Sequence, residues 1–185
     1  MPTTAKRKTG YKDLFDLPEN MTGEIIDGEI VATPRPSPRH GRTASDLTIE
    51  IGSAYRFGRG GPGGWWILDE VEVRLGEDIL VPDISGWRRD RLPDLPDTNW
   101  IEVPPDWVCE VLSPSTVRTD RVKKMPKYAQ AGVPFLWLVD PELRTLEAFR
   151  LESGKWFLSQ CFEGDDPVRA EPFQEIEIDL SLLWA

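Results

Sequence analysis

The stretch that most constrains the fold is DWVCEVL, at residues 106–112. Its side chains are apolar on both faces of an extended strand, which is typical of a strand in the interior of a sheet covered on both sides. One carboxylate, Glu110, interrupts this apolar run between Val108 and Leu112 on the same strand face. An ionised carboxylate inside a protein costs several kcal/mol unless it is paired or bound to a metal. Glu110 therefore needs a partner.

The rest of the chain alternates between strand-like and helix-like segments. The predicted elements are the strands 65–75, 78–85, 106–112 and 134–140, the helices 42–57 and 118–131, and the hairpins 23–33 and 145–162. Pro82 interrupts the second of these strands, which places that strand at an edge or makes it irregular there. This order of elements predicts an α/β domain.

The length of 185 residues fits one domain with a substantial core. We expect a flexible N-terminal arm over residues 1–20 and a single domain over residues 21–185. No run of about 18 apolar residues exists, so no membrane-spanning helix is expected. The N-terminus also lacks the apolar core of a signal peptide. Cys109 and Cys161 lie in strand-like runs and are expected to be buried and free, which fits a cytoplasmic protein.

Charge is distributed unevenly along the chain. The net charge is −10, which argues against nucleic-acid binding when the chain is taken as a whole. Residues 115–130, however, carry five basic side chains and one acid, whereas residues 161–185 are strongly acidic. The basic segment could attract a polyanion, or it could be a solvated helix face. We expect the acidic segment to lie away from any DNA-binding surface.

Two further charged residues are expected close to Glu110. Asp83 follows Pro82 on the preceding strand, and Lys124 lies on the helix that leaves the Glu110 strand. Two carboxylates held close together repel, and a hard cation with oxygen ligands such as Mg²⁺ removes that repulsion. A lysine beside the cation can orient a water molecule or stabilise phosphoryl oxygens.

These three residues are therefore a sufficient set for metal-assisted hydrolysis of a phosphodiester. The spacing leaves a second interpretation open, in which Glu110 and Lys124 form a buried ion pair and Asp83 caps a turn. Hydrolysis of another bond by paired carboxylates without a metal, as in glycosidases, is a third.

The sequence resembles the Uma-two family of endonucleases, which have the restriction-endonuclease-like fold and a variant PD-(D/E)XK signature. The resemblance extends from about residue 23 to the C-terminal IDLSLLW. It is carried by GEIIDGEIV, PSPRHGR, VPDISGWRRDR and the long run PPDWVCEVLSPSTVRTDRVKKMPKYAQAGVPFLWLVDPELRTLEAFRL. It implies a central mixed β-sheet flanked by helices and magnesium-dependent hydrolysis of DNA, with Mn²⁺ as an alternative cation. It also implies a homodimer.

The resemblance assigns roles to individual residues. Asp83 and Glu110 match the two acidic positions of the signature and would hold the metal. The signature's lysine position is occupied by Leu112, so the resemblance points to Lys124 on the following helix. Pro126 departs from the family pattern, in which this position has an ordinary helix-forming residue. A proline inside a helix removes a backbone hydrogen bond. A helix that starts near Lys123 would avoid this problem and would make Lys123 a rival for the catalytic role.

A different class of function stays open beside the nuclease. The chain could be a catalytically inactive restriction-like fold that acts as a binding or dimerisation module. Several further residues have two interpretations each. Glu50 is an extra acid near the metal or a solvated helix carboxylate, and His40 is a general base or a polar loop tip that contacts phosphate. Arg88, Arg89 and Arg91 grip phosphates or form surface ion pairs, and Tyr128 is expected to pack and hydrogen-bond near the site.

Overall fold

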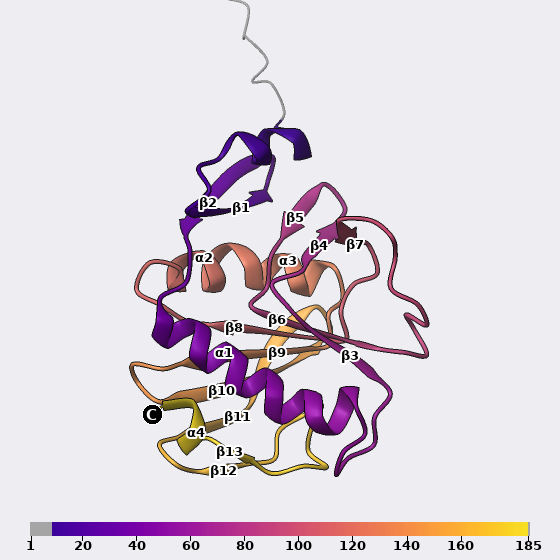
Figure 1. Ribbon diagram of the computed structural model, residues 1–185, viewed down its shortest axis with the longest axis vertical. Helices are drawn as coiled ribbons and strands as arrows, with labels where there is room; N and C mark the ends of the chain where they lie inside the picture. The colour runs from indigo at the N-terminus through magenta and orange to yellow at the C-terminus, as the bar shows by residue number, and fades with distance from the viewer. Residues whose placement is uncertain (1–8, 185) are drawn as a thin grey trace, which may run out of the picture.

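A six-stranded sheet forms the centre of the protein, for which the computed structural model describes residues 9–184. In order across the sheet, its strands are β11 (Lys155–Glu163), β10 (Thr145–Glu152), β9 (Phe135–Asp140), β8 (Trp107–Val111), β6 (Ile84–Arg88) and β3 (Trp65–Asp69) (Figure 1). Strands β8 and β9 run parallel, and the other neighbouring strands run antiparallel. The predicted central mixed sheet is therefore confirmed.

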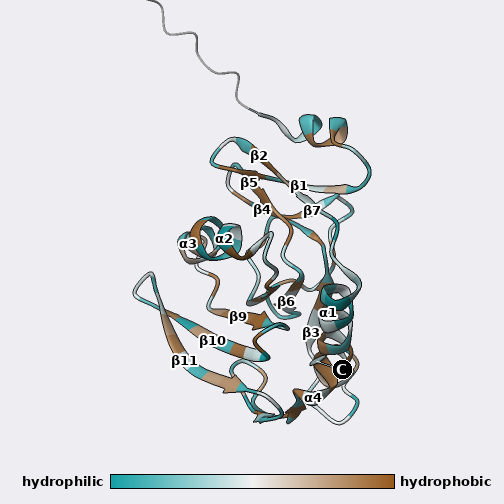
Figure 2. Cartoon of the chain, turned by 90° about the vertical axis from the view of Figure 1, so that its left-hand side faces the viewer, coloured by the Kyte–Doolittle hydropathy of each residue, from teal (hydrophilic) through white to brown (hydrophobic). Residues whose placement is uncertain are grey.

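Helices cover both faces of this sheet, as Figure 2 shows. One face is covered by α1 (Pro38–Ile51) and the π-helical turn η2 (Gly52–Arg56), and the other by α2 (Val117–Thr119), the π-helical turn η3 (Asp120–Lys124) and α3 (Met125–Gln130). Cys109 shares a core with Leu47 of α1, whereas Val108 shares a core with Tyr128 of α3. Since strand residues alternate between faces, Glu110 lies on the α3 side with Val108.

A second sheet of five short strands, which we call the small sheet, lies at one end of the protein (Figure 1). Its strands, in order, are β2 (Glu29–Pro34), β1 (Met21–Ile26), β5 (Asp78–Leu80), β4 (Glu72–Leu75) and β7 (Trp100–Ile101). The predicted hairpin forms its edge, with Asp27 and Gly28 at φ angles of 54° and 75° in the turn. Positive φ at both central residues is what a two-residue turn of the favoured twist requires.

Two of the segments in which the chain passes between the sheets, residues 70–71 and residues 81–83, interrupt the strands predicted over 65–75 and 78–85, so these two predictions are wrong. Glu70 adopts a φ of 47°, so the chain leaves β3 after Asp69 and enters β4 in the other sheet. The return passes through Val81, Pro82 and Asp83 between β5 and β6. The Glu70 amide donates to the Asp83 carbonyl at 3.1 Å, which holds the two crossing segments side by side.

The helix that follows β8 accommodates its proline by a local change of winding. A wider π-helical turn, Asp120–Lys124, directly precedes α3, and Pro126 sits in the first turn of α3. The backbone N–H that proline lacks is not needed in the first turn of a helix. The wider π-helical turn accommodates the local distortion of the backbone before Pro126. Asp120 and Lys124 are both buried, while Lys123 is exposed. The helical segment predicted over 118–131 is therefore continuous through Asp120, and a helix start near Lys123 is not observed.

The N-terminal segment differs from the expected arm where the structure describes it. Residues Tyr11–Asp16 form the 3₁₀ helix η1. The Tyr11 hydroxyl donates to Glu72 at 2.5 Å, and its ring packs edge-on against Trp100 at 4.7 Å. Residues 1–8 of the predicted arm lie outside the described residues. None of the described helices is long and apolar enough to cross a membrane.

An aromatic cluster ties the C-terminal segment to the central sheet. The elements of the C-terminal segment are β12 (Pro167–Val168), β13 (Ile178–Asp179) and α4 (Ser181–Trp184), which lie at the end of the protein away from the β1–β2 hairpin (Figure 1). Phe173, on the loop between β12 and β13, is fully buried. Its ring contacts four others edge-on, with centroids 4.7–5.6 Å away: Tyr55, Trp65, Trp107 and Trp137. Of the two cysteines, Cys109 is buried as expected, but Cys161 is exposed.

We predict that Phe173→Ala lowers the free energy of unfolding by about 3–5 kcal/mol, since it leaves a cavity among four aromatic rings. Urea denaturation followed by tryptophan fluorescence measures the change. Phe173→Leu, which keeps most of the apolar volume, serves as the control and should lose clearly less. Equal losses in the two variants would mean that the ring contacts contribute little.

Candidate active site

A cavity of about 450 Å³ opens where the two sheets meet. Its walls are the β1–β2 hairpin, the two crossing segments, the start of α1, the end of β8 and the helix after β8. The lining residues that matter below are Glu24, His40, Asp83, Glu110, Asp120 and Lys124, with hydroxyl groups from Ser113, Ser115 and Thr116 nearby. The predicted site residues Asp83, Glu110 and Lys124 are thus brought together in one cavity.

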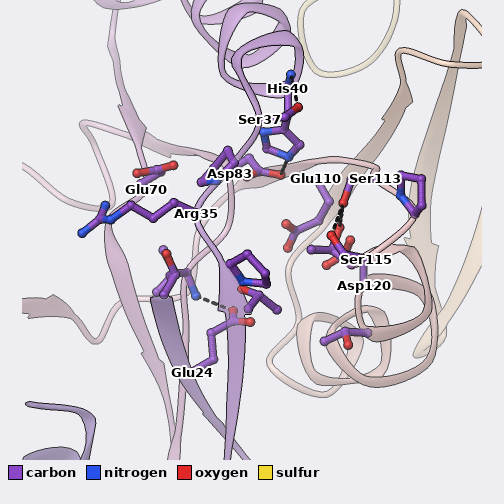
Figure 3. Close-up of a pocket in the computed structure, with 18 of the residues that line it drawn as sticks. Glu24, Arg35, Ser37, His40, Glu70, Asp83, Glu110, Ser113, Ser115 and Asp120 are labelled. Atoms are coloured by element: carbon purple, nitrogen blue, oxygen red, sulfur yellow. Dashed lines mark hydrogen bonds and ion pairs between the residues drawn. The ribbon is translucent and has the colours of Figure 1, made fainter. Parts of the chain in front are cut away.

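The register of the central sheet explains why Asp83 and Glu110 meet. Ile84 of β6 is paired with Cys109 of β8, and one more step of this antiparallel register places Asp83 opposite Glu110. Directly opposed residues have Cβ atoms about 5 Å apart and point to the same face. The Val111 amide donates to Asp83 Oδ2 at 2.7 Å, which fixes the Asp83 side chain beside the end of β8. Figure 3 shows both carboxylates at the same cavity.

Glu110 is almost completely buried and is held by two donors. Lys124 Nζ lies 2.8 Å from Oε1 and 2.9 Å from Oε2, and the Tyr128 hydroxyl donates to Oε1 at 2.5 Å. The expectation that Tyr128 packs and hydrogen-bonds at the site is met. Burial raises the pKa of Glu110, and the Lys124 charge partly offsets that rise.

Lys124 is surrounded by oxygen atoms from different parts of the fold. Besides Glu110, its Nζ contacts Glu24 Oε1 at 3.1 Å, the Val81 carbonyl at 3.1 Å and Asp120 Oδ1 at 3.8 Å. Burial alone would lower the pKa of Lys124, but the carboxylates outweigh burial and raise it. Lys124 is therefore a cation at neutral pH.

Glu24 was not recognised from the sequence, although it belongs to the site. It lies on β1, is 4 % exposed, and accepts a hydrogen bond from the Val81 amide at 2.7 Å. A signal was present, because Glu24 precedes two buried isoleucines in a hairpin strand and is itself an acid in an apolar run. Its partner on a distant helix could not be identified from the hairpin alone.

His40 is also part of the site and is not a loop tip. Ser37 caps α1 by accepting from the His40 amide at 3.3 Å, which places His40 in the first turn of that helix. The His40 side chain is buried, and its Nε2 lies 3.3 Å from Asp83 Oδ2. Burial lowers the pKa of His40, but the Asp83 carboxylate outweighs this and raises it overall. The sequence Ser-Pro before His40 is a helix-start signal that could have revealed this position.

Other residues that the sequence singled out lie elsewhere. Glu50 is half-buried on α1 and does not line the cavity. The three arginines after Asp83 stabilise the end of β6. Arg91 pairs with Asp106 at 2.8 Å, Arg89 donates to the Trp65 carbonyl at 3.2 Å, and Arg88 lies over the Trp65 ring. The surface ion pair is thus formed by Arg91, whereas Arg89 and Arg88 contact a backbone carbonyl and an aromatic ring.

The basic segment 115–130 is largely neutralised by the fold. Lys124 is buried at the site, Lys127 pairs with Asp27 and with Asp78 at 2.9 Å, and Arg121 pairs with Glu147. The exposed basic residues of the segment that remain are Arg118 and Lys123. A strongly positive helix face is therefore absent from this segment.

The cavity itself carries an excess of negative charge. Glu24, Asp83, Glu110 and Asp120 surround the Lys124 ammonium group, and Glu70, Glu142 and Arg35 are exposed lining residues of the same cavity. Acids thus outnumber lysine and arginine side chains at the cavity by six to two. Among residues 9–184, no three His, Cys, Asp or Glu side chains are grouped so as to hold a metal ion. An all-protein cage is thus absent from this part of the chain. Mg²⁺ does not need one, since it commonly binds through one or two carboxylates and keeps several waters or substrate oxygens.

The donor set at the cavity fits such an ion. The contacts to Asp83 described above both fall on Oδ2, so Oδ1 can bind a cation. Glu110 has room for a cation only when Lys124 withdraws, because both of its oxygens contact that ammonium group. The residues present can therefore hold a hard divalent cation between Asp83 and Glu110, provided that Lys124 moves.

A mixed sheet between helices, with two acids and a lysine gathered at its edge, defines a restriction-endonuclease-like domain. The chain belongs to the Uma2 family, whose model matches residues 11–182 and carries the description "Putative restriction endonuclease". This confirms the resemblance stated from the sequence. A crystal structure from Anabaena variabilis, described as "a putative nuclease belonging to DUF820", is similar to this chain with a TM-score of 0.75 and 26 % sequence identity. The match covers 94 % of this chain and 96 % of that one. No curated protein matches the chain.

We predict that the metal-free protein loses stability as pH rises, in part through Asp120. Burial raises the pKa of Asp120 to about 6 from its usual 3.8, against the opposing effects of Lys124 and Thr116. The folded state then binds more protons than the unfolded state between about pH 4 and pH 6, so the free energy of unfolding falls across this range by up to about 3 kcal/mol. Urea denaturation in EDTA at pH 4.5 and pH 8 measures it.

Asp120→Asn should remove this part of the pH dependence, because the amide does not titrate. Asp46→Asn is the matched control, since Asp46 is a partly exposed α1 carboxylate paired with Arg42 and does not line the cavity. A pH dependence that is the same in wild type and Asp120→Asn would contradict the raised pKa of Asp120.

Proposed function

We propose that this protein is a Mg²⁺-dependent endonuclease that hydrolyses phosphodiester bonds of DNA, with Mn²⁺ as an alternative cation. The observation that carries the proposal is the convergence of Asp83, Glu110 and Lys124 in one cavity of a restriction-endonuclease-like fold. The description of the family and that of the Anabaena protein as nucleases support it. The charge of the helix after β8 does not contribute, since most of it is neutralised.

Each residue has a separate role in this proposal. Asp83 and Glu110 would hold the cation, which lowers the pKa of a bound water and stabilises the leaving oxygen. Lys124, a cation beside Glu110, would donate hydrogen bonds to the attacking water or to phosphoryl oxygens. Tyr128 and His40 would orient the two carboxylates from behind, through the contacts that they make with Glu110 and Asp83.

The alternative is a binding or dimerisation module that keeps the fold without activity. In that case the cluster would serve as a buried ion-pair network alone. Such a network offers no reason for more acids than cations, because each unpaired buried charge destabilises the fold. We therefore favour the nuclease.

Plasmid cleavage tests the proposed nuclease directly. Supercoiled DNA should be nicked or linearised by wild type with Mg²⁺ and left intact with EDTA. Glu110→Gln, Asp83→Asn and Lys124→Met should each lower the rate by about 100-fold or more, as loss of metal ligands or charge-stabilising groups does in other enzymes.

Glu50→Gln is the control for cleavage, since it removes a carboxylate that does not line the cavity. It should cleave like wild type. Cleavage that persists in EDTA, or that survives Glu110→Gln, would exclude the metal-dependent mechanism.

The homodimer implied by the family resemblance also belongs to this proposal, and β11 is the surface that we propose for it. This nine-residue strand lies at the edge of the central sheet and exposes Phe157 and Leu158. Antiparallel pairing of two copies about Ser159 would place Lys155 of each copy opposite Glu163 of the other, so the edge is complementary to itself in charge.

We predict a dimer by sedimentation velocity and a monomer after Phe157→Lys with Leu158→Lys, because the paired edges would then carry like charges. Leu143→Lys places the same charge on an exposed leucine outside the strand and should stay dimeric. A monomeric wild type at tens of micromolar would refute this assembly.

A further inference from the structure

The ammonium group of Lys124 uses all its hydrogen-bonding capacity within the protein. It contacts the Val81 carbonyl at 3.1 Å, Glu24 Oε1 at 3.1 Å and Glu110 at 2.8–2.9 Å. A lysine ammonium has three donors, and here each has an acceptor from the chain. In this arrangement Lys124 has no donor to offer to a water molecule or a phosphate.

A cation at Glu110 changes this arrangement. This step rests on the proposed function, in which Asp83 and Glu110 hold a divalent ion. The ion would repel the Lys124 ammonium group and take the same carboxylate oxygens. Lys124 must then withdraw from Glu110, and its position afterwards depends on the acceptors that remain.

Glu24 is the acceptor best placed to keep Lys124 at the cavity. Its carboxylate already contacts Nζ, and the Val81 amide fixes it at 2.7 Å. It belongs to β1 in the small sheet, whereas Glu110 belongs to β8 in the central sheet. The contact with Glu24 can therefore persist when the contact with Glu110 is lost.

Asp120 is less suited to this role. Its Oδ1 is 3.8 Å from Nζ, beyond hydrogen-bond distance, and it lies one turn before Lys124 on the same helix. Its pKa of about 6 means that it is also partly protonated in mildly acidic solution. Glu24, in contrast, lies within hydrogen-bond distance of Nζ and belongs to a different element from Lys124.

We propose that Glu24 is a positioning residue that holds the Lys124 ammonium group beside the reaction site while Glu110 binds the metal. Glu24 acts through Lys124 and does not bind the ion. Release of Glu110 would free one Lys124 donor for a water molecule or a phosphate that enters the cavity. Without Glu24, Lys124 would compete with the metal for Glu110.

Metal affinity measured by calorimetry tests this role without any cleavage assay. Mn²⁺ is titrated into wild type, Glu24→Gln and the control Glu70→Gln, each in the Lys124 and in the Lys124→Met background. Glu70 lines the same cavity and is exposed, but it makes no contact with Lys124. Thermal melting first confirms that each variant is folded. In Glu24→Gln, the oxygen of the introduced amide can still accept from the Val81 amide.

We expect Glu24→Gln to weaken Mn²⁺ binding by about 10-fold or more when Lys124 is present, as loss of a residue that orients a metal ligand typically does. In the Lys124→Met background, where no ammonium group competes, its effect should shrink to that of Glu70→Gln. Glu70→Gln should have the same small effect in both backgrounds. An unchanged affinity in Glu24→Gln, or an equal loss in both backgrounds, overturns the proposal.

A crystal structure of the wild type with Mn²⁺ tests the same role without any variant. Nζ should stay within about 3 Å of Glu24, a normal hydrogen-bond distance, and should have left Glu110. Coordination of Mn²⁺ by Glu24, or Nζ still on Glu110, overturns it. A wild type that binds neither Mn²⁺ nor Mg²⁺ refutes the proposed nuclease and this inference together, whereas the outcomes above refute the role of Glu24 alone.

Discussion

The buried ammonium group of Lys124 is the contact that joins the separate parts of the protein at the cavity. It links the helix after β8 to Glu110 in the central sheet, to Glu24 in the small sheet and to Val81 in a crossing segment. Buried ion pairs contribute little net stability, since apolar side chains of similar size often do as well. A cluster with four acids and one lysine is therefore a poor solution for stability alone. The cation site proposed above would explain it better.

The crossings between the sheets decide where this cluster forms. Asp83 lies on the returning segment, one position before the first paired residue of β6, so it stands at the open end of the central sheet. Glu70 lies beside it on the outgoing segment through the hydrogen bond to the Asp83 carbonyl. The cavity exists because the small sheet is attached there and closes the space above Asp83 and Glu110 with its β1–β2 hairpin.

The sequence predicted the parts of the site that depend on local pattern. Glu110 stood out because a carboxylate in a doubly apolar strand is unusual, and Asp83 because Pro82 ends a strand. Lys124 followed from the helix spacing and from the family resemblance. The sequence could not predict that residues 65–75 and 78–85 divide between two sheets, since alternation of apolar residues does not specify the partner strand. The left-handed conformation of Glu70, a residue with no special preference for it, leaves no mark in the pattern.

Long-range pairing explains the remaining errors. Glu24 and His40 each meet their partners across distant parts of the chain, and neither partner can be found from local spacing. The net charge of the basic segment after β8 was summed over that segment alone. In the fold, its basic side chains form ion pairs with Glu147, Asp27 and Asp78 from other elements. A local sum of charge is thus a poor guide to surface potential when the facing elements are acidic.

The acidity of the cavity has a consequence for the proposed function. The excess of acids at the cavity would repel a phosphodiester, whose own charge is negative, and the weak basic surface nearby offers little compensation. The proposed divalent cation between Asp83 and Glu110 would offset two negative charges and would present a positive centre to the phosphate. In this protein the cation would therefore be a condition for DNA to enter the site as well as for the chemistry. Substrate binding and metal binding would then be coupled, each strengthening the other to the same degree.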